Sequence, residues 1–164
     1  MKEIRLEELN LNPFTLLGND WLVLAAGNED GYNAMTVSWG HFGCLWSPNR
    51  PTAAVYVRPS RYTKKFIDEQ EFFTLSLIED RKALGYLGSH SGRDGDKFAA
   101  AGIKPLFTDN TVAVDDARLI FVCRKLYSAP LSEQGFIDKN ILTKDYSGGD
   151  MHEMYVGEII KAYE

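Results

Sequence analysis

The sequence predicts a mostly β domain with short helices, folded as a small, Greek-key-like antiparallel barrel. Short runs of β-branched, apolar and aromatic residues recur along the chain between turn residues, enough for six or more strands. Stretches with helical periodicity are few and short, and most expected strands follow one another as neighbours. The 164 residues fit one domain, so residues 1–164 are expected to form a single unit.

The first half of the chain is expected to contain four strands. Each is a compact apolar or alternating run, too short for a buried helix: 21–26, 33–39, 52–57 and 72–78. Residues 1–12 are interpreted as a lead-in that covers a sheet edge. The turn residues 27–31 predict a hairpin with a longer loop. The glycine- and proline-containing segment 40–51, which carries Cys44 and Trp46, is predicted to be a connecting loop.

The second half mixes short helices with long strands. A helix over about 61–69 is expected, with Ser60 as its N-cap, and a second over 80–89, weakened by Gly85. A polar loop, 91–98, then leads into an alanine run. The remaining segments are predicted as one strand or two over 112–129, loop with one or two helical turns over 130–146, and a final strand over 153–162.

Composition excludes several classes of function. The formal net charge of -5 and the pI near 5.2 argue against general nucleic-acid binding. No apolar run is long enough to span a membrane, and the charged N-terminus does not resemble a signal peptide. Cys44 and Cys123 lack metal-ligand spacing, so no metal site is expected. They are interpreted as free thiols in a reducing cytoplasm.

A cluster of positive charge marks the end of the third expected strand. Arg58, Arg61, Lys64 and Lys65 fall within eight residues, without a carboxylate before Asp68. The following helix would begin there, and helix N-termini offer unpaired N–H groups that suit a phosphate. The alternative is a solvated basic face. However, cations are unfavourable in a first helical turn, which favours a compensating anion.

The second expected strand, 33–39, carries short hydroxyl side chains at alternate positions. Thr36 and Ser38 lie beside Trp39 and could meet the polar edge of a flat ring. The alternative is that they are ordinary half-buried strand residues.

Other catalytic patterns are absent from the sequence. There is no Ser-His-Asp order, zinc signature, Walker motif or dinucleotide-binding glycine motif. His41, His90 and His152 are scattered, and a lone histidine is commonly structural. Cys44 is either a redox thiol or a buried structural cysteine.

Five segments in order carry a family resemblance. They are Asn33–Trp39, the Ser47-Pro48 loop, Arg58–Thr63, Ser91–Phe98 and His152–Glu158. Over roughly residues 14–162 the chain resembles the flavin reductase-like family, which includes flavoredoxins. The resemblance implies an FMN-binding split barrel and a homodimer in which both subunits contribute to each flavin site. It also implies flavin reduction by NADH or NADPH as the default activity.

The resemblance also implies roles for individual residues. Thr36, Val37, Ser38 and Trp39 would lie along the flavin, with Val57 and Arg58 flanking its ring. Ser60, Arg61, Tyr62 and Thr63 would hold the phosphate, and Arg93 and Lys97 would lie near the cofactor or across the dimer. His152 would share the pocket with Trp39. Because hydride delivery to a flavin needs alignment above all, we expect His152 to position the substrate. The segment 40–46 is more aromatic than the family pattern, which puts the usual nicotinamide access in question.

Two functional classes stay open, with a third behind them. The first is an NAD(P)H-dependent FMN reductase or related oxidoreductase. The second is a flavoredoxin-like FMN electron carrier, reduced by a protein partner and without NAD(P)H activity of its own. The third is a structural barrel that has lost its cofactor. The sequence leaves NADH and NADPH equally open as donors.

Overall fold

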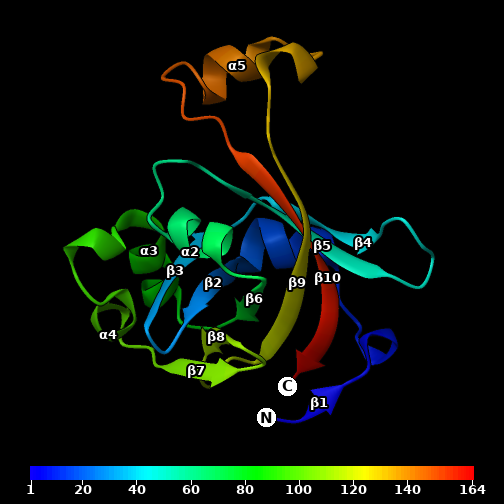
Figure 1. Cartoon of the computed structure of the whole chain (residues 1–164), viewed down its shortest axis with the longest axis vertical. Helices are drawn as coiled ribbons and strands as arrows, with labels where there is room; N and C mark the ends of the chain where they lie inside the picture. Colours follow the sequence, from blue (N-terminus) through cyan, green and yellow to red (C-terminus); the bar gives the residue numbers. More distant parts are fainter.

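The computed structural model describes residues 1–164 and confirms a mostly β antiparallel fold (Figure 1). The main sheet has eight strands: β1 (Glu3–Ile4), β2 (Leu22–Asn28), β3 (Gly31–Val37), β4 (Gly40–Cys44), β5 (Pro51–Val57), β6 (Phe72–Leu77), β9 (Leu119–Pro130) and β10 (Glu153–Tyr163). A separate two-stranded sheet pairs β7 (Pro105–Thr108) with β8 (Thr111–Val114).

The main sheet curls into a half-open barrel. Its strands follow the order β3-β2-β6-β9-β10-β5-β4, and β1 pairs with β10, so the predicted lead-in does cover a sheet strand. The two ends of this order, β3 and β4, are consecutive in the chain. Only Ser38 and Trp39 connect them. The barrel is therefore split at the segment where polar and aromatic side chains were singled out in the sequence.

Short helices accompany the sheet, and three of them, in the middle of the chain, pack against one side of it (Figure 1). The helices are α1 (Pro13–Thr15), which continues into a π-helical turn at Leu16–Asp20, α2 (Thr63–Glu69), α3 (Arg81–Ser89), α4 (Lys97–Ala101) and α5 (Asn140–Asp145). Asp80 caps α3 by accepting hydrogen bonds from the N–H groups of Lys82 and Ala83. No helix is long and apolar enough to cross a membrane.

The core has two parts, one on each face of the sheet. Successive side chains of a strand point to opposite faces, and β2 is buried on both. Leu24 therefore joins Phe73 and Tyr155 inside the barrel. Val23 packs with the helices and β8, among residues that include Leu84. This double burial explains why β2 is a continuous apolar run and not an alternating one.

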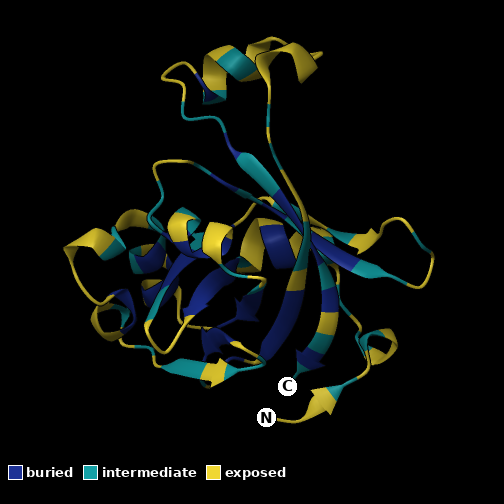
Figure 2. Cartoon of the chain, viewed as in Figure 1, coloured by how far each residue is buried: buried dark blue, intermediate teal, exposed yellow.

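An arm rises from one end of the barrel. The upper parts of β9 and β10 extend beyond the sheet body and carry residues 131–152, called the arm here, with α5 at its tip (Figure 1). Most of the arm is exposed, in contrast to the barrel interior (Figure 2). Ile137 in the arm is 96% exposed. The base of the arm, close to β5, contacts the candidate site described below.

Several local predictions were wrong. The segment 40–51 is not only a loop, because β4 pairs with β5 over residues 40–44. Its glycines indicated a turn, but Gly40 lies in a strand and allows close packing against β5. A Cβ at this position would lie 2.6 Å from the carbonyl oxygen of Ala54. The β2–β3 hairpin is tight, since Asn28 pairs with Gly31. Strand β7 was not expected at all.

The start of α2 also differs from the prediction. The helix begins at Thr63 with Tyr62 at the N-cap position, and no side chain caps it. Ser60 lies before the helix, so its predicted capping role is wrong. Its hydroxyl bonds instead to Asp150 in the arm.

Candidate functional site

Two adjoining cavities lie between the open edge of the barrel and the base of the arm. The ring cavity, of about 240 Å³, is lined by Met35, Thr36, Val37, Ser38, Trp39, Tyr56, Arg58, Arg61 and His152. The basic cavity, of about 220 Å³, is lined by Asn33, Met35, Arg58, Ser60, Arg61, Tyr62, Thr63, Ser89, His90, Ser91, Gly92, Arg93 and Lys97. Met35, Arg58 and Arg61 line both. The cavities therefore adjoin along these shared side chains, and together they are called the joined cavities here.

All but one of the sequence-predicted site residues line these cavities. The exception is Val57, which is fully buried in the barrel core. Local sequence patterns carried no signal for Tyr56, Ser89 or His90, which also line the site.

The positively charged residues at the cavities are not the same four that were predicted from the sequence. Lys64 turns away to the far side of α2, where its Nζ lies 2.7 Å from Asp68 and 2.9 Å from Glu153. Lys65 lies over the ring of Phe66. Arg58 and Arg61 remain at the cavities, and the fold adds Arg93 and Lys97 from the later segment.

The basic cavity holds positive charge without a lining carboxylate. The Arg61 side chain makes no hydrogen bond or ion pair with the protein. Arg93 donates to the carbonyl of Ser60 at 3.1 Å and lies over the ring of Tyr62. Lys97 is only 5% exposed and donates to the carbonyl of Leu87 at 2.7 Å. Burial, and then the positive charge of Arg61, lower the pKa of Lys97 to about 8.

A close backbone approach forms one wall of the basic cavity. A Cβ on Gly92 would lie 2.3 Å from Oδ1 of Asn33 and 2.8 Å from the ring of Tyr62, so glycine is required for this packing. Asn33 is buried and donates to the hydroxyl of Thr63 at 2.9 Å. These contacts hold the segment that carries Arg93 against β3 and the start of α2.

The ring cavity runs along an edge strand. Strand β3 pairs only with β2, so the backbone groups on its outer side have no partner in the sheet. The hydroxyl of Thr36 is not one of the free groups, because it donates to the carbonyl of Leu84 in α3 at 2.6 Å. Ser38 and Trp39 stand at the split of the barrel, and Trp39 is 47% exposed. The edge therefore offers backbone polar groups beside an accessible aromatic ring.

His152 lies at the back of the ring cavity, against Trp39. The two ring centres are 4.8 Å apart, so residues from distant parts of the chain meet here. Burial, and then the charge of Arg58, lower the pKa of His152 to about 4, so the imidazole is neutral at pH 7. Its Nδ1 lies 2.8 Å from the hydroxyl of Tyr146.

The base of the arm docks directly on the site. Arg58 donates to the carbonyls of Asp150 and Asp145, both at 3.1 Å. Ser60 donates both its N–H and its hydroxyl to the carboxylate of Asp150. Sequence reasoning missed these arm residues. The sequence around Gly149 and Asp150 indicates only a turn, and both residues have positive φ.

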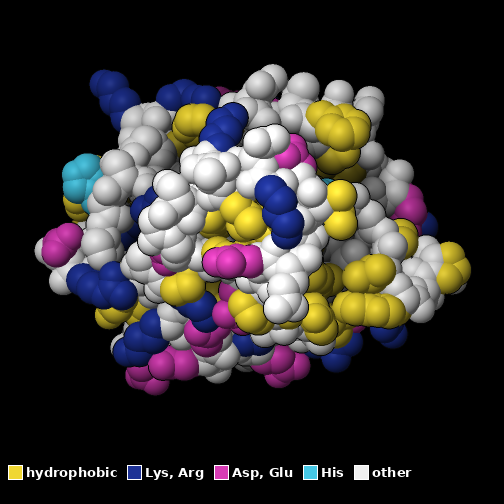
Figure 3. All heavy atoms as spheres, turned by 90° about the horizontal axis from the view of Figure 1, so that it is seen from above, with side chains coloured by type: hydrophobic (Ala, Val, Ile, Leu, Met, Phe, Trp, Pro, Cys, Tyr) yellow, Lys and Arg dark blue, Asp and Glu magenta, His cyan; other side chains and the backbone are white.

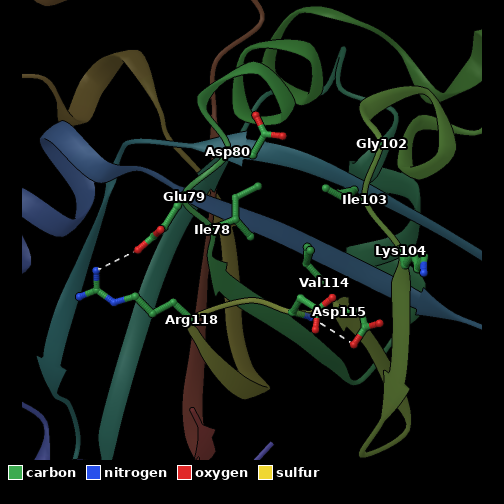
Figure 4. A pocket seen from close by; sticks show the side chains of 10 residues that line it. Ile78, Glu79, Asp80, Gly102, Ile103, Lys104, Val114, Asp115 and Arg118 are labelled. Carbon is green, nitrogen blue, oxygen red and sulfur yellow. Dashed lines mark hydrogen bonds and ion pairs between the residues drawn. The ribbon is translucent and has the colours of Figure 1, made fainter.

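A larger cavity, of about 530 Å³, lies elsewhere, between α3, α4 and the start of β9 (Figure 4). Most of its charged groups are engaged with each other or with the backbone. Glu79 pairs with Arg118 at 3.7 Å, and Asp80 caps α3. Asp115 accepts a hydrogen bond from the N–H of Asp116. No group of residues in the protein has the arrangement of a metal site.

A half-open antiparallel barrel of this kind is the fold of split-barrel flavoproteins, and comparisons with known proteins agree. The model of the flavin reductase like domain matches residues 17–164. The chain therefore belongs to the flavin reductase-like family, which has an FMN-binding split-barrel fold. No curated protein shows significant sequence similarity to it.

Solved structures share the fold at low sequence identity. Flavoredoxin from Methanosarcina acetivorans superposes with a TM-score of 0.69 and 22% identity, over 88% of this chain and 68% of that one. An FMN-binding domain of a flavin reductases-like enzyme from Shewanella baltica gives 0.67 and 17%, over 98% and 75%. The Streptomyces globisporus NADH:FAD oxidoreductase SgcE6, solved with NAD and FAD fragments, gives 0.61 and 17%, over 88% and 74%.

Proposed function

We propose that the protein binds FMN across the two joined cavities and transfers a hydride to it from NADH or NADPH. The observation that carries this proposal is the unpaired Arg61, in a cavity without carboxylates that adjoins a cavity along an edge strand. A mononucleotide has the matching chemistry: a dianionic phosphate at one end and a flat polar ring at the other.

The basic cavity suits the phosphate. The guanidinium groups of Arg61 and Arg93 provide planar N–H donors that fit phosphate oxygens, and Lys97 adds a point charge. Tyr62 and Thr63 line the same wall. The short helix α2 is not needed for this argument, because the side-chain charges alone supply the attraction.

The ring cavity suits the flavin ring. The outer edge of β3 can hydrogen-bond the polar edge of the ring, while Trp39, Tyr56 and Met35 provide apolar surface. The bound flavin supplies the hydride-accepting chemistry, so the residues need only bind, orient and exclude water. We assign His152 to positioning the nicotinamide by a hydrogen bond, because alignment is what hydride delivery requires. Without a dinucleotide-binding motif, the nucleotide is expected to be held only loosely against FMN.

We further propose that the active form is a homodimer. Exposed apolar residues gather on the arm and near the β4–β5 hairpin, among them Ile137, Ile141, Trp46 and Tyr127. Viewed onto the arm, hydrophobic side chains lie at the centre and toward one side, with isolated charged side chains of both signs among them (Figure 3). We expect a two-fold interface of about 2,000 Å² or more. Light scattering that finds an FMN-loaded monomer at micromolar concentration would contradict this.

The two thiols suit the reducing cytoplasm that we propose as the location. Cys44 is exposed, Cys123 is buried, and both are free.

The binding part of the proposal is tested by titrating the apoprotein with FMN and with riboflavin, following flavin fluorescence. We expect FMN to bind more tightly than riboflavin, which lacks the phosphate. Arg118→Ala is a matched control, since this arginine lies at the other cavity. Equal affinity for both flavins would show that the basic cavity does not bind the phosphate.

A second candidate function is an FMN electron carrier that a protein partner reduces. The position of Trp39 favours it, because this large side chain, packed against His152, limits the space in which a nicotinamide could stack. Two structural neighbours bear the name flavoredoxin. The two candidates differ in whether NADH or NADPH reduces the bound flavin directly.

A further inference from the structure

The structure points to a positioning role for Tyr146: we infer that its hydroxyl holds His152 as the Nε2–H tautomer, so that Nε2 donates a hydrogen bond into the ring cavity. The assignment of the acceptor rests on the proposed function, under which it is the carboxamide oxygen of the nicotinamide. The tautomer does not depend on the proposed function, because it is a property of the protein without cofactor.

The two nitrogens of His152 have different surroundings. Nδ1 lies 2.8 Å from the hydroxyl oxygen of Tyr146. Nε2 has no hydrogen-bond partner in the protein. Every side-chain nitrogen that is buried does have a partner, so Nε2 cannot be one of the buried atoms. Nε2 is therefore accessible, although the residue as a whole is only 8% exposed. Since His152 lines the ring cavity, this nitrogen is the atom that a ligand there can reach.

The proton of the Tyr146 hydroxyl decides the tautomer. The side chain is 8% exposed, and Nδ1 of His152 is its one hydrogen-bond partner in the protein. If Nδ1 carried the imidazole proton, the hydroxyl hydrogen would have no acceptor in a largely dry position, which is costly. With the hydroxyl donating to Nδ1, the imidazole proton resides on Nε2, where water or a ligand can accept it. Burial raises the pKa of Tyr146, which keeps the hydroxyl protonated.

The surroundings of Tyr146 keep its hydroxyl in place. The guanidinium of Arg58 lies 5.2 Å from the ring centre, and the ring of Phe136 lies 5.6 Å away on the arm. The backbone is held by hydrogen bonds to Leu142 and from Gly149. Tyr146 directly follows α5, so the base of the arm determines which nitrogen of His152 faces the cavity.

The test compares the FMN-free wild type with Tyr146→Phe, which keeps the ring and removes only the hydroxyl. Nitrogen NMR on histidine-labelled protein reports which imidazole nitrogen is protonated, and the His152 signals are assigned by their loss in His152→Asn. We expect a protonated Nε2 in the wild type and a mixture of tautomers in Tyr146→Phe. Tyr163→Phe is the matched control, because it also removes a bonded hydroxyl, which donates to Asp109 at 2.7 Å, and Tyr163 lines neither cavity.

Kinetics supply a second readout, with NADH and NADPH as the donors. Tyr146→Phe should raise the KM for the nucleotide by about two- to tenfold, the scale of one neutral hydrogen bond. The kcat and the affinity for FMN should stay nearly unchanged. A wild-type Nδ1–H tautomer, or a tautomer unchanged in a folded Tyr146→Phe, would overturn the inference. A failure to bind FMN would instead contradict the proposed function while leaving the tautomer result intact.

Discussion

Ser60 donates two hydrogen bonds to the carboxylate of Asp150, one from its backbone N–H at 2.9 Å and one from its hydroxyl at 2.5 Å. The two residues are 90 positions apart in the chain, on the strand–helix connection and at the base of the arm. An internal carboxylate thus occupies the donors of a residue expected to hold phosphate. Arg58 reinforces the contact by binding the backbone carbonyl of Asp150.

This contact predicts that Asp150 weakens FMN binding. In Asp150→Asn the negative charge beside the basic cavity disappears, so FMN should bind more tightly by about 0.5–1 kcal/mol, the scale of an exposed charge pair. Riboflavin affinity should not change. Asp145→Asn is the control, because Asp145 contacts Arg58 through its backbone carbonyl. Weaker FMN binding in Asp150→Asn would mean that the carboxylate positions Ser60 for the phosphate.

Arg61 should be the largest single contributor to phosphate binding. It is the one cation of the basic cavity with no partner in the protein, so its charge is free for a ligand. Arg61→Ala should weaken FMN binding by about 1–3 kcal/mol. Fluorescence titrations that show unchanged affinity for FMN and riboflavin alike would exclude this cavity from the site.

FMN binding should depend on pH through Lys97. With a pKa of about 8, Lys97 is charged below that pH and loses its charge above it. A phosphate prefers the charged form, so FMN affinity should fall as the pH rises through about 8, with little change for riboflavin. Measurements should stay above the second phosphate pKa of about 6. Lys97→Met should bind FMN more weakly and lose this pH dependence, and an unchanged profile would contradict the role.

Substitutions of His152 separate positioning from proton transfer. Because His152 is neutral at pH 7, we expect it to act as a hydrogen-bond donor. His152→Asn should retain most of the activity, since an amide still donates, whereas His152→Leu should raise KM for the nucleotide. FMN affinity should change little in either. Large and equal losses of kcat with an unmoved KM would show proton transfer instead.

The tight packing around Gly157 predicts that a larger residue there would destabilise the barrel core. A Cβ at this position would lie 2.7 Å from the ring of Phe73 and 2.9 Å from Cβ of Cys123. Gly157→Ala should therefore lower the free energy of unfolding by about 1–3 kcal/mol, the usual cost of overpacking. Gly148→Ala is the control, because a Cβ there would meet nothing within 4 Å. Equal denaturation midpoints for both variants would show that β9 and β10 adjust without strain.

The sequence predicted the elements whose signals are local. The strands at 21–26 and 72–78 were found because burial determines their residue types within a few positions. Strand β4 was missed because Gly40 and Gly43 look like turn residues. In the structure Gly40 allows a close approach to Ala54, which is a long-range requirement. A local pattern cannot show which residue across the sheet needs that space.

The residues of the candidate site also divide into those with a local sequence signal and those placed by long-range contacts. Arg61 and Trp39 were predicted from short segments, and the structure brings them to the joined cavities. The displacement of Lys64 toward Glu153, and the contacts of Asp150 and Tyr146 with the site, depend on segments that meet only after folding. Nothing in the local sequence around these residues distinguishes them from an ordinary charged helix face or a turn.

The most direct test of the central claim is an anaerobic absorbance titration of the FMN-loaded protein with NADH and NADPH. If the joined cavities hold FMN and admit a nicotinamide, the flavin absorbance should bleach on addition of at least one of the two nucleotides. Arg61→Ala should need more FMN to reach the same bleaching. A protein that takes up FMN but does not bleach with either nucleotide would contradict the reductase activity and support the electron carrier. A protein that takes up no FMN would contradict both.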